Sequence, residues 1–500
     1  MKKWLLPFLS MALAAVLLYA LAWQLTRQGI DRQARSKAAI YEAGGTPWDF
    51  APRAVEDLIA GRAFGAVDIS HDQRGLIARS RNTAPYELGV PLPYPVDLKY
   101  FPVLQLGLDN EGPVRLQWLV RERLAGPMLV SEPIRMKPGS HDMRMDLQAL
   151  RWYWADTGDT IPLPRAVAML RLKLRQPPNT IVRLRWLRWR DVSKDGARLA
   201  THPLPWSTLR RHSLSAISDI PVLLLPGTGV EAMLAQRDAI AQAQPAAVVV
   251  ASVDALRYWS RPAGDAMQTI AALLAYALIM LLTWKRTRQA QDRPRLRGLL
   301  SLLQAGVCAG PLLAWAIGMY GDPDPGAAWL STMLAALGFT LWLAWRSYAR
   351  NWRWLAWQGH MDWRDWILPS ATVLLAFILL LASGSAPQRP GIGKALVYLA
   401  WAAMQQLLIL AVLAPRLHAL FKPRWLCALV LGTLFALAHA PNALLMQLTL
   451  LAEMVWAWHF LKRPVLLPVV LAHALAGLLL AAAISGLPLR SLEVGARFLQ

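Results

Sequence analysis

The sequence is poor in cysteine and in charged residues. Only two of its 500 residues are cysteines, Cys308 and Cys427, and both lie inside apolar runs. This excludes a disulfide framework for the polar part of the chain, and no Cys–His spacing typical of a zinc site occurs. Charged residues make up 17% of the chain, whereas 55% of it is hydrophobic and 24 residues are Trp. That balance is typical of a membrane protein with an attached soluble part.

Acidic residues are the scarcer charge sign. The sequence has 31 Asp and Glu against 53 Lys and Arg, a net charge of +22. In a soluble protein this excess would indicate a nucleic-acid partner. Here Lys and Arg collect in loops between apolar segments, where the positive-inside rule of membrane proteins accounts for them. We therefore expect the lipid bilayer as a partner and no nucleic acid.

Apolar runs of spanning length are absent from residues 26–265 and occur on both sides of that region. We interpret residues 1–25, in which an apolar span from about Trp4 to Leu25 follows the basic start Met1-Lys2-Lys3, as an uncleaved signal anchor. A cleaved signal peptide is the alternative, because Ala20-Leu21-Ala22 is typical of a signal-peptidase site. Further spans are predicted at residues 267–284, 298–319, 329–345, 366–383, 394–414, 425–441, 443–461 and 465–485. The prediction is a polytopic α-helical membrane protein with about nine spans.

The loops between these spans predict the orientation. Basic residues collect in the loops on the side of the N-terminus, which are 285–297, 346–365, 415–424 and 462–463. Loop 320–328, on the other side, holds two aspartates and no base. This predicts a multi-pass protein of a bacterial-type cytoplasmic (inner) membrane, with the N-terminus inside and residues 26–265 outside, in the periplasm. The chain then divides into the anchor 1–25, an extracytoplasmic domain 26–265, additional transmembrane helices 266–364, a membrane domain 365–485 and a tail 486–500.

The extracytoplasmic domain contains segments in which apolar and polar residues alternate. Leu170, Leu172 and Leu174 interleave with basic residues, and similar alternation occurs at 114–120 and 142–147. Such segments, separated by Pro, Gly and Asp turns, predict an antiparallel β-sandwich at about 95–195, followed by a mixed α/β appendage at 196–265. The phase slips at Trp186-Leu187, which predicts a bulge or a sheet edge. The pattern distantly resembles jelly-roll carbohydrate-binding modules.

The polar positions of these predicted strands are mostly basic. They are Arg171, Lys173, Arg175, Arg183, Arg185, Arg188 and Arg190. Such a face is suited to an anionic glycan or a lipid headgroup. Antiparallel sheets also commonly leave one face in water, so a solvated basic face without a ligand is the alternative.

Strongly polar side chains inside predicted spans cluster in the last four spans. They are Gln405, Gln406, His439, Asn442, Gln447, Glu453 and His473. A rise of about 1.5 Å per residue puts Gln405, Glu453 and His473 near the middle of the bilayer. Polar residues at that depth cost free energy and commonly mark functional sites, so we predict a shared polar pocket. The alternative is that they only link helices through hydrogen bonds.

Three short motifs in this region occur in a characteristic order. The amide pair Gln405-Gln406 precedes "FALAHAPN", in which Phe435 and His439 are four residues apart, and His473 follows a short basic turn and an apolar run. This order resembles the CPBP (Abi) family of intramembrane endopeptidases, which includes CAAX prenyl proteases, over roughly residues 365–485. The resemblance implies a site in which catalytic positions are filled by Gln405, Gln406, His439 and His473, and pocket positions by Phe435, Asn442 and Gly477. It implies no metal and no other cofactor.

The sequence departs from the family at positions that matter for catalysis. The family has two glutamates where this chain has Gln405-Gln406, an arginine where it has Leu410, and Asn or Asp where it has Gly477. An amide cannot act as a general base, although it can still hold a water or a peptide carbonyl. Glu453 is a speculative replacement for the lost base, with a histidine or a neutral, hydrogen-bonded Glu453 as alternatives.

Two functions remain open from the sequence. The first is an intramembrane endopeptidase that acts on or binds a membrane-associated peptide, with activity reduced or lost. The second is a catalytically inactive relative that serves as an envelope receptor or scaffold and binds a glycan or protein through its β-domain. A transporter or polymer-export component is disfavoured, because no internal repeat is visible.

Overall fold

The structure is a computed structural model, and it describes most of the chain outside the central region. The described residues are 2–42, 48–92, 95–190, 199–200, 202–206, 219–256, 277–278, 281–282, 300–301, 303–308, 334–335, 337–342, 361–383, 391–483 and 494. The chain forms two compact units.

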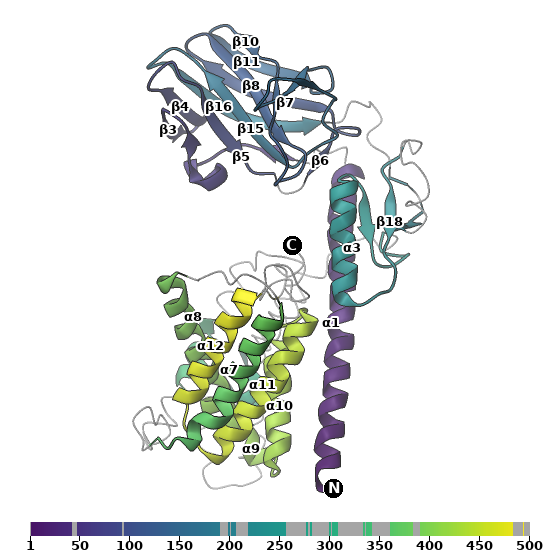
Figure 1. Cartoon of the computed structure of the whole chain (residues 1–500), viewed down its shortest axis with the longest axis vertical. Coiled ribbons are helices and arrows are strands. Elements are labelled where there is room, and N and C mark those ends of the chain that lie inside the picture. The colour runs from purple at the N-terminus through teal and green to yellow at the C-terminus, as the bar shows by residue number, and fades with distance from the viewer. Residues whose placement is uncertain are drawn as a thin grey trace. The chain divides into compact units, whose positions relative to one another are not determined.

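Four helices in the described part are long and apolar enough to cross a membrane. They are α1 (Lys2–Glu42), α7 (Arg364–Ser383), α11 (Ala443–Lys462), and the continuous helix of α8 (Ile392–Gln406), π-helix η6 (Leu407–Leu413) and α9 (Ala414–Leu420). Two shorter apolar helices, α10 (Arg424–Leu437) and α12 (Leu467–Ala483), lie among them (Figure 1). These apolar helices suggest membrane insertion.

Three of the predicted spans are not tested by this structure. Spans 267–284, 298–319 and 329–345 lie largely outside the described residues, as do loop 320–328 and the tail 486–500 except for residue 494. The count of nine spans and the membrane orientation therefore stay predictions.

Helix α1 is longer than the predicted first span. Its 41 residues extend about 60 Å at 1.5 Å per residue, twice the thickness of a bilayer core. The predicted boundary at residue 25 lies inside the helix, because polar residues after Trp23 end the apolar run without ending the helix. The second half buries one stripe of side chains at helical spacing, Ile30, Ala34, Ala38 and Tyr41.

Two antiparallel sheets form the predicted β-sandwich. Sheet A has the order β11 (Gly139–Asp146), β7 (Val103–Asn110), β16 (Ile181–Arg190), β4 (Gly75–Ser80), β3 (Val67–Asp72), with β1 (Asp49–Phe50) paired to β16. Sheet B has the order β13 (Thr160–Ile161), β12 (Trp152–Trp154), β9 (Leu129–Ser131), β8 (Val114–Arg121), β15 (Met169–Arg175), β5 (Tyr86–Val90), β2 (Ala63–Phe64), with β10 (Ile134–Met136) paired to β8. The sandwich begins before the predicted residue 95, because strands β1 to β5 also belong to its sheets.

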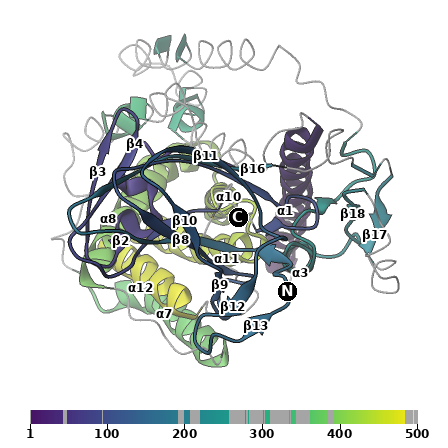
Figure 2. The ribbon, with the colours of Figure 1, turned by 90° about the horizontal axis from the view of Figure 1, so that it is seen from above.

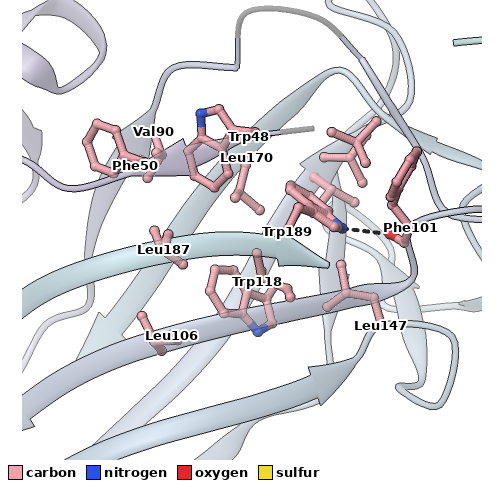
Figure 3. Close-up of a cluster of buried hydrophobic side chains, with 14 of the residues drawn as sticks. Trp48, Phe50, Val90, Phe101, Leu106, Trp118, Leu147, Leu170, Leu187 and Trp189 are labelled. Carbon is pink, nitrogen blue, oxygen red and sulfur yellow. Dashed lines mark hydrogen bonds between the residues drawn. The ribbon is translucent and has the colours of Figure 1, made fainter. Parts of the chain in front are cut away.

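The alternation read from the sequence sets the two faces of each strand. Leu170, Leu172 and Leu174 are fully buried, and the basic residues between them point away from the core. Three tryptophans, Trp118, Trp152 and Trp189, are among the largest fully buried side chains. Figure 3 shows Trp118 and Trp189 within the core. The Trp189 indole N–H donates to the Phe101 carbonyl oxygen at 2.7 Å, so its polar atom is satisfied inside the core.

Smaller elements complete the unit that contains the β-sandwich. Two 3₁₀ turns, η1 (Val55–Asp57) and η2 (Ile59–Gly61), precede β2, and β6 (Val96–Asp97) pairs with β14 (Ala166–Val167). The appendage has three parallel strands, β17 (Leu204–Pro205), β18 (Val222–Leu224) and β19 (Val248–Val250), and the helix α3 (Val230–Ala243), so its described part contains both strands and a helix.

The second half of α1 packs against this appendage, with α3 beside it (Figures 1 and 2). The Asp31 carboxylate accepts hydrogen bonds from the Ala251 backbone N–H and the Ser252 hydroxyl, both at 2.7 Å. The Tyr41 hydroxyl donates to the Ala246 carbonyl oxygen at 3.2 Å. These contacts tie the end of β19 to α1 and explain why the helix continues beyond the apolar run.

Asp97 gives the sandwich a testable pH dependence. Its carboxylate is 2% exposed and accepts the Lys99 backbone N–H at 2.9 Å. Burial raises the pKa of Asp97, and the Lys99 hydrogen bond and the nearby charge of Arg165 offset this only in part. The folded state therefore holds this proton more tightly than the unfolded chain. The resulting stabilisation is full below the ordinary carboxyl pKa of about 3.9 and is lost as the pH rises through the folded-state pKa.

We therefore expect Asp97→Asn to slow amide hydrogen exchange in β6 and β14 at pH 7. At pH 3 the variant and the parent should exchange alike, because both side chains are then neutral. Faster exchange in the variant at pH 7 would show that the ionised carboxylate stabilises the fold.

Candidate functional site

The structure brings together three of the predicted polar residues of the helical region. Gln406 ends α8 where the helix widens into the π-helix η6, a feature often found at functional sites. Its side-chain amide nitrogen lies 2.9 Å from a Glu453 carboxylate oxygen and 3.1 Å from His473 Nδ1. Gln406 and Glu453 are fully buried and His473 is 7% exposed. We call Gln406, Glu453 and His473 the polar cluster.

The hydrogen bonds of the polar cluster determine which of its atoms donate and which accept. The Gln406 NH₂ group has two hydrogens, and it donates one to Glu453 and one to His473. His473 Nδ1 must then be the acceptor, so a neutral imidazole carries its proton on Nε2. Gln406 Oε1 and Glu453 Oε1 are buried and accept no hydrogen bond within the part of the chain that the structure describes. Both atoms are suited to an N–H or O–H donor from a ligand.

Aromatic side chains surround the His473 ring. Trp456 stacks on it at a centroid distance of 5.3 Å, and Phe435 and Tyr398 meet it edge-on at 5.5 and 6.4 Å. Phe435 also contacts the ring of His439 at 4.7 Å, so it lies between the two imidazoles. His439 Nδ1 is 2.7 Å from the Phe435 carbonyl oxygen, which fixes its ring next to the cluster without a hydrogen bond to it.

Other predicted site residues have different places. Gln405 is half-buried and takes no part in the polar cluster, because neighbouring helix positions point in different directions. Asn442 is the N-cap of α11, where its side-chain oxygen accepts the Leu445 backbone N–H at 3.1 Å. A Cβ at Gly477 would collide with the Tyr398 hydroxyl, so Tyr398 occupies the space that Asn or Asp would need.

Tyr398 was not predicted as a site residue. The available signal was the glycine at 477, because glycine inside an apolar helix often marks a close approach of another group. Among the described residues, no group of three His, Cys, Asp or Glu side chains is arranged to hold a metal.

The outer face of sheet A, which points away from the sandwich core, is a second candidate site. The register between β16 and β7 shifts between Leu184 and Trp186, which confirms the bulge predicted from the phase slip. The bulge turns Trp186 onto the outer face, opposite Gly107. A Cβ at Gly107 would lie 2.5 Å from the Trp186 ring, so only glycine lets this ring rest on the sheet.

Ion pairs surround Trp186 on this face. Arg185 pairs with Asp109 at 3.0 Å and with Asp142, and the Arg188 guanidinium lies 4.8 Å from the Trp186 ring centroid. Further pairs join Arg183 to Asp72 and Arg188 to Asp49. The predicted basic face of β16 is thus balanced by aspartates from neighbouring strands. Arg171 of β15 likewise pairs with Glu87, whereas the Arg190 side chain lies outside the described set.

Comparisons with known proteins find few likenesses. No protein-family model and no curated protein matches the sequence. One similar solved structure is a family 11 carbohydrate-binding module from Clostridium thermocellum, in complex with a β-1,3-1,4-mixed-linked tetrasaccharide. It is 9% identical, with a TM-score of 0.19, and the match covers 26% of this chain and 84% of the module. The family 11 module of a cellulosomal cellulase from the same organism is also 9% identical, with a TM-score of 0.18, coverage of 29% of this chain and 84% of that one.

Proposed function

We propose that the chain is an inner-membrane protein whose β-sandwich lies outside the membrane and binds a glycan on the outer face of sheet A. The observation that carries this proposal is Trp186, an aromatic ring held on the sheet surface among paired arginines and aspartates. In this function the apolar helices anchor a receptor or scaffold in the cell envelope.

The chemistry of this face suits a sugar. The flat side of a sugar ring packs on an aromatic ring, while its hydroxyl groups pair with carboxylates and guanidinium groups. Trp186 supplies the ring, and Asp109 and Asp142 supply acceptors that Arg185 holds in fixed positions. Because positive and negative side chains balance here, the face favours an uncharged glycan over a polyanion.

The test is to replace Trp186 with Ala in the full-length protein and measure binding of soluble uncharged glycans, β-1,3-1,4-mixed-linked glucan among them. We expect binding to weaken about 30-fold, equivalent to about 2 kcal/mol for a central aromatic contact. Trp154→Ala is the matched control, because Trp154 is 36% exposed on sheet B. Equal effects of the two substitutions on glycan binding would contradict the proposed site. If the protein binds no glycan but binds protein ligands, it would instead be a receptor for a protein.

A second candidate function is hydrolysis of a membrane-associated peptide at the polar cluster. It is favoured by one observation: Glu453 lies within hydrogen-bond distance of Gln406, beside His473. The family has a carboxylate at the position of Gln405-Gln406, and Glu453 supplies a carboxylate from a neighbouring helix instead. Such a site resembles the arrangement expected for the CPBP family, with the acid moved from α8 to α11.

The roles in this second function follow from the side chains. An ionised Glu453 would take a proton from a water that attacks the peptide carbonyl carbon, and would deliver it to the leaving amine as the C–N bond breaks. Gln406 would orient the carboxylate through its N–H. The Nε2–H of His473 is a donor suited to the negative charge that develops on the carbonyl oxygen.

A further inference from the structure

Sheet B carries a row of three arginines on its outer face. In the registers of the sheet, Arg115 of β8 lies directly opposite Arg135 of β10 on one side and Arg175 of β15 on the other. Residues directly opposite in neighbouring strands project from the same face, with Cβ atoms about 5 Å apart. All three side chains are exposed, whereas Leu116, next to Arg115, is fully buried. We call Arg135, Arg115 and Arg175 the arginine row.

Among the residues that the structure describes, no acidic side chain pairs with the arginine row. Like charges directly opposite each other destabilise a sheet. No ion pair involves these three arginines in the part of the chain that the structure describes, and only Arg175 makes a hydrogen bond, from Nε to the Thr83 carbonyl oxygen at 3.0 Å. Arg183, Arg185 and Arg188 of β16 are instead each paired with an aspartate. The contrast indicates that the arginine row is arranged for a charge that comes from elsewhere.

The same three arginines line a cleft of about 530 Å³. Its other lining residues include Thr83, Pro113, Pro177 and Pro178, and no acidic side chain is among those described. Guanidinium groups bind carboxylate, phosphate and sulfate through paired hydrogen bonds. The cleft is open to solvent, so a polymer that carries such groups can reach all three arginines.

We propose that the arginine row binds the anionic groups of an acidic polysaccharide. The site is separate from Trp186, which lies on the other sheet, so it does not depend on the glycan-binding function proposed above. Arg175, held by Thr83, and Arg135 flank Arg115, so anionic groups spaced along a chain can bridge neighbouring guanidinium groups. Binding is expected to weaken as salt concentration rises, because the site is exposed.

The experiment uses the full-length protein in a neutral detergent with four probes: dextran sulfate, uncharged dextran of the same length, inorganic sulfate, and short-chain phosphatidylglycerol. We expect dextran sulfate to bind through the arginine row, any binding of uncharged dextran to be unchanged by Arg115→Gln, and inorganic sulfate to compete only at high concentration. Arg115→Gln should weaken dextran sulfate binding at least tenfold. The matched control Arg74→Gln removes the same charge from the exposed β3–β4 turn, and should change binding less than twofold.

Several results would overturn the proposal. Equal weakening by the two substitutions would mean that the net positive charge alone attracts the polymer. Loss of short-chain phosphatidylglycerol binding in Arg115→Gln, with dextran sulfate binding unchanged, would identify a lipid headgroup site instead. The unfolding temperature of Arg115→Gln should equal or exceed that of the parent, because the substitution removes charge repulsion between neighbouring arginines. A clear decrease would mean that Arg115 makes a stabilising contact and that the arginine row is not unpaired. Trp186→Ala should leave dextran sulfate binding unchanged, so this proposal and the previous one fail separately.

Discussion

Replacing Glu453 with Gln should abolish peptide cleavage if the polar cluster is catalytic. Glutamine has nearly the same shape and keeps an oxygen that accepts the Gln406 N–H, so the cluster should keep its packing. It cannot take a proton from water, and general-base catalysis typically contributes about 100- to 10,000-fold in rate. The measurement is cleavage of a set of membrane peptides by the full-length protein in bilayer nanodiscs, followed by mass spectrometry of the products.

Three further variants make the outcome decisive. Asp362→Asn is the matched control, because Asp362 pairs with Arg463 at the end of the helical region, away from the polar cluster. It should leave cleavage unchanged. Replacing both Gln405 and Gln406 with Glu should raise activity if the helices retain a protease site. Cleavage by Glu453→Gln at the parent rate would remove Glu453 from the mechanism, and loss of cleavage in His473→Ala alone would assign the base to the imidazole.

Periodicity alone predicted much of the fold. Apolar runs of spanning length predicted the positions of α7, α8, α11 and the shorter helices, and period-two alternation predicted strands β8 and β15 with the correct buried faces. The length of α1 was missed because the helix is held beyond its apolar run by Asp31 and Tyr41, whose partners lie more than 200 residues away. Contacts of that range leave no local pattern in the sequence.

The candidate sites were predictable to different degrees. Gln406, Glu453 and His473 stood out because polar residues are rare in apolar helices, and depth along the helices suggested that they meet. Gln405 makes no hydrogen bond to the polar cluster among the described residues, because adjacent helix positions point in different directions, and its place in the shared pocket stays a prediction. The arginine row was not predicted as a unit, because its members come from three strands whose register the alternating pattern does not reveal.

Replacing Gly75 with Ala should destabilise sheet A more than any single polar substitution on its surface. Gly75 has φ +140°, a conformation that side-chain-bearing residues rarely adopt, and a Cβ there would collide with the Leu184 carbonyl oxygen. Strain and overpacking of this kind together cost about 3 kcal/mol or more, because a backbone atom cannot turn aside as a side chain can. The effect should appear as faster amide hydrogen exchange in β4 and β16.

Gly158→Ala is the matched control for this substitution. Gly158 also has a positive φ, +77°, but no atom of the described residues lies within 4 Å of the position that a Cβ would take, so only the conformational cost of about 1 kcal/mol applies. The loss of stability in Gly75→Ala beyond that in Gly158→Ala therefore measures how closely β16 approaches β4 at the bulge. Because the same bulge turns Trp186 onto the outer face, Gly75→Ala should also weaken glycan binding, whereas Gly158→Ala should not. If the two alanine substitutions change hydrogen exchange equally, the backbone at the bulge can move to accommodate the added methyl group. The position of Trp186 would then be fixed by its contact with Gly107 alone.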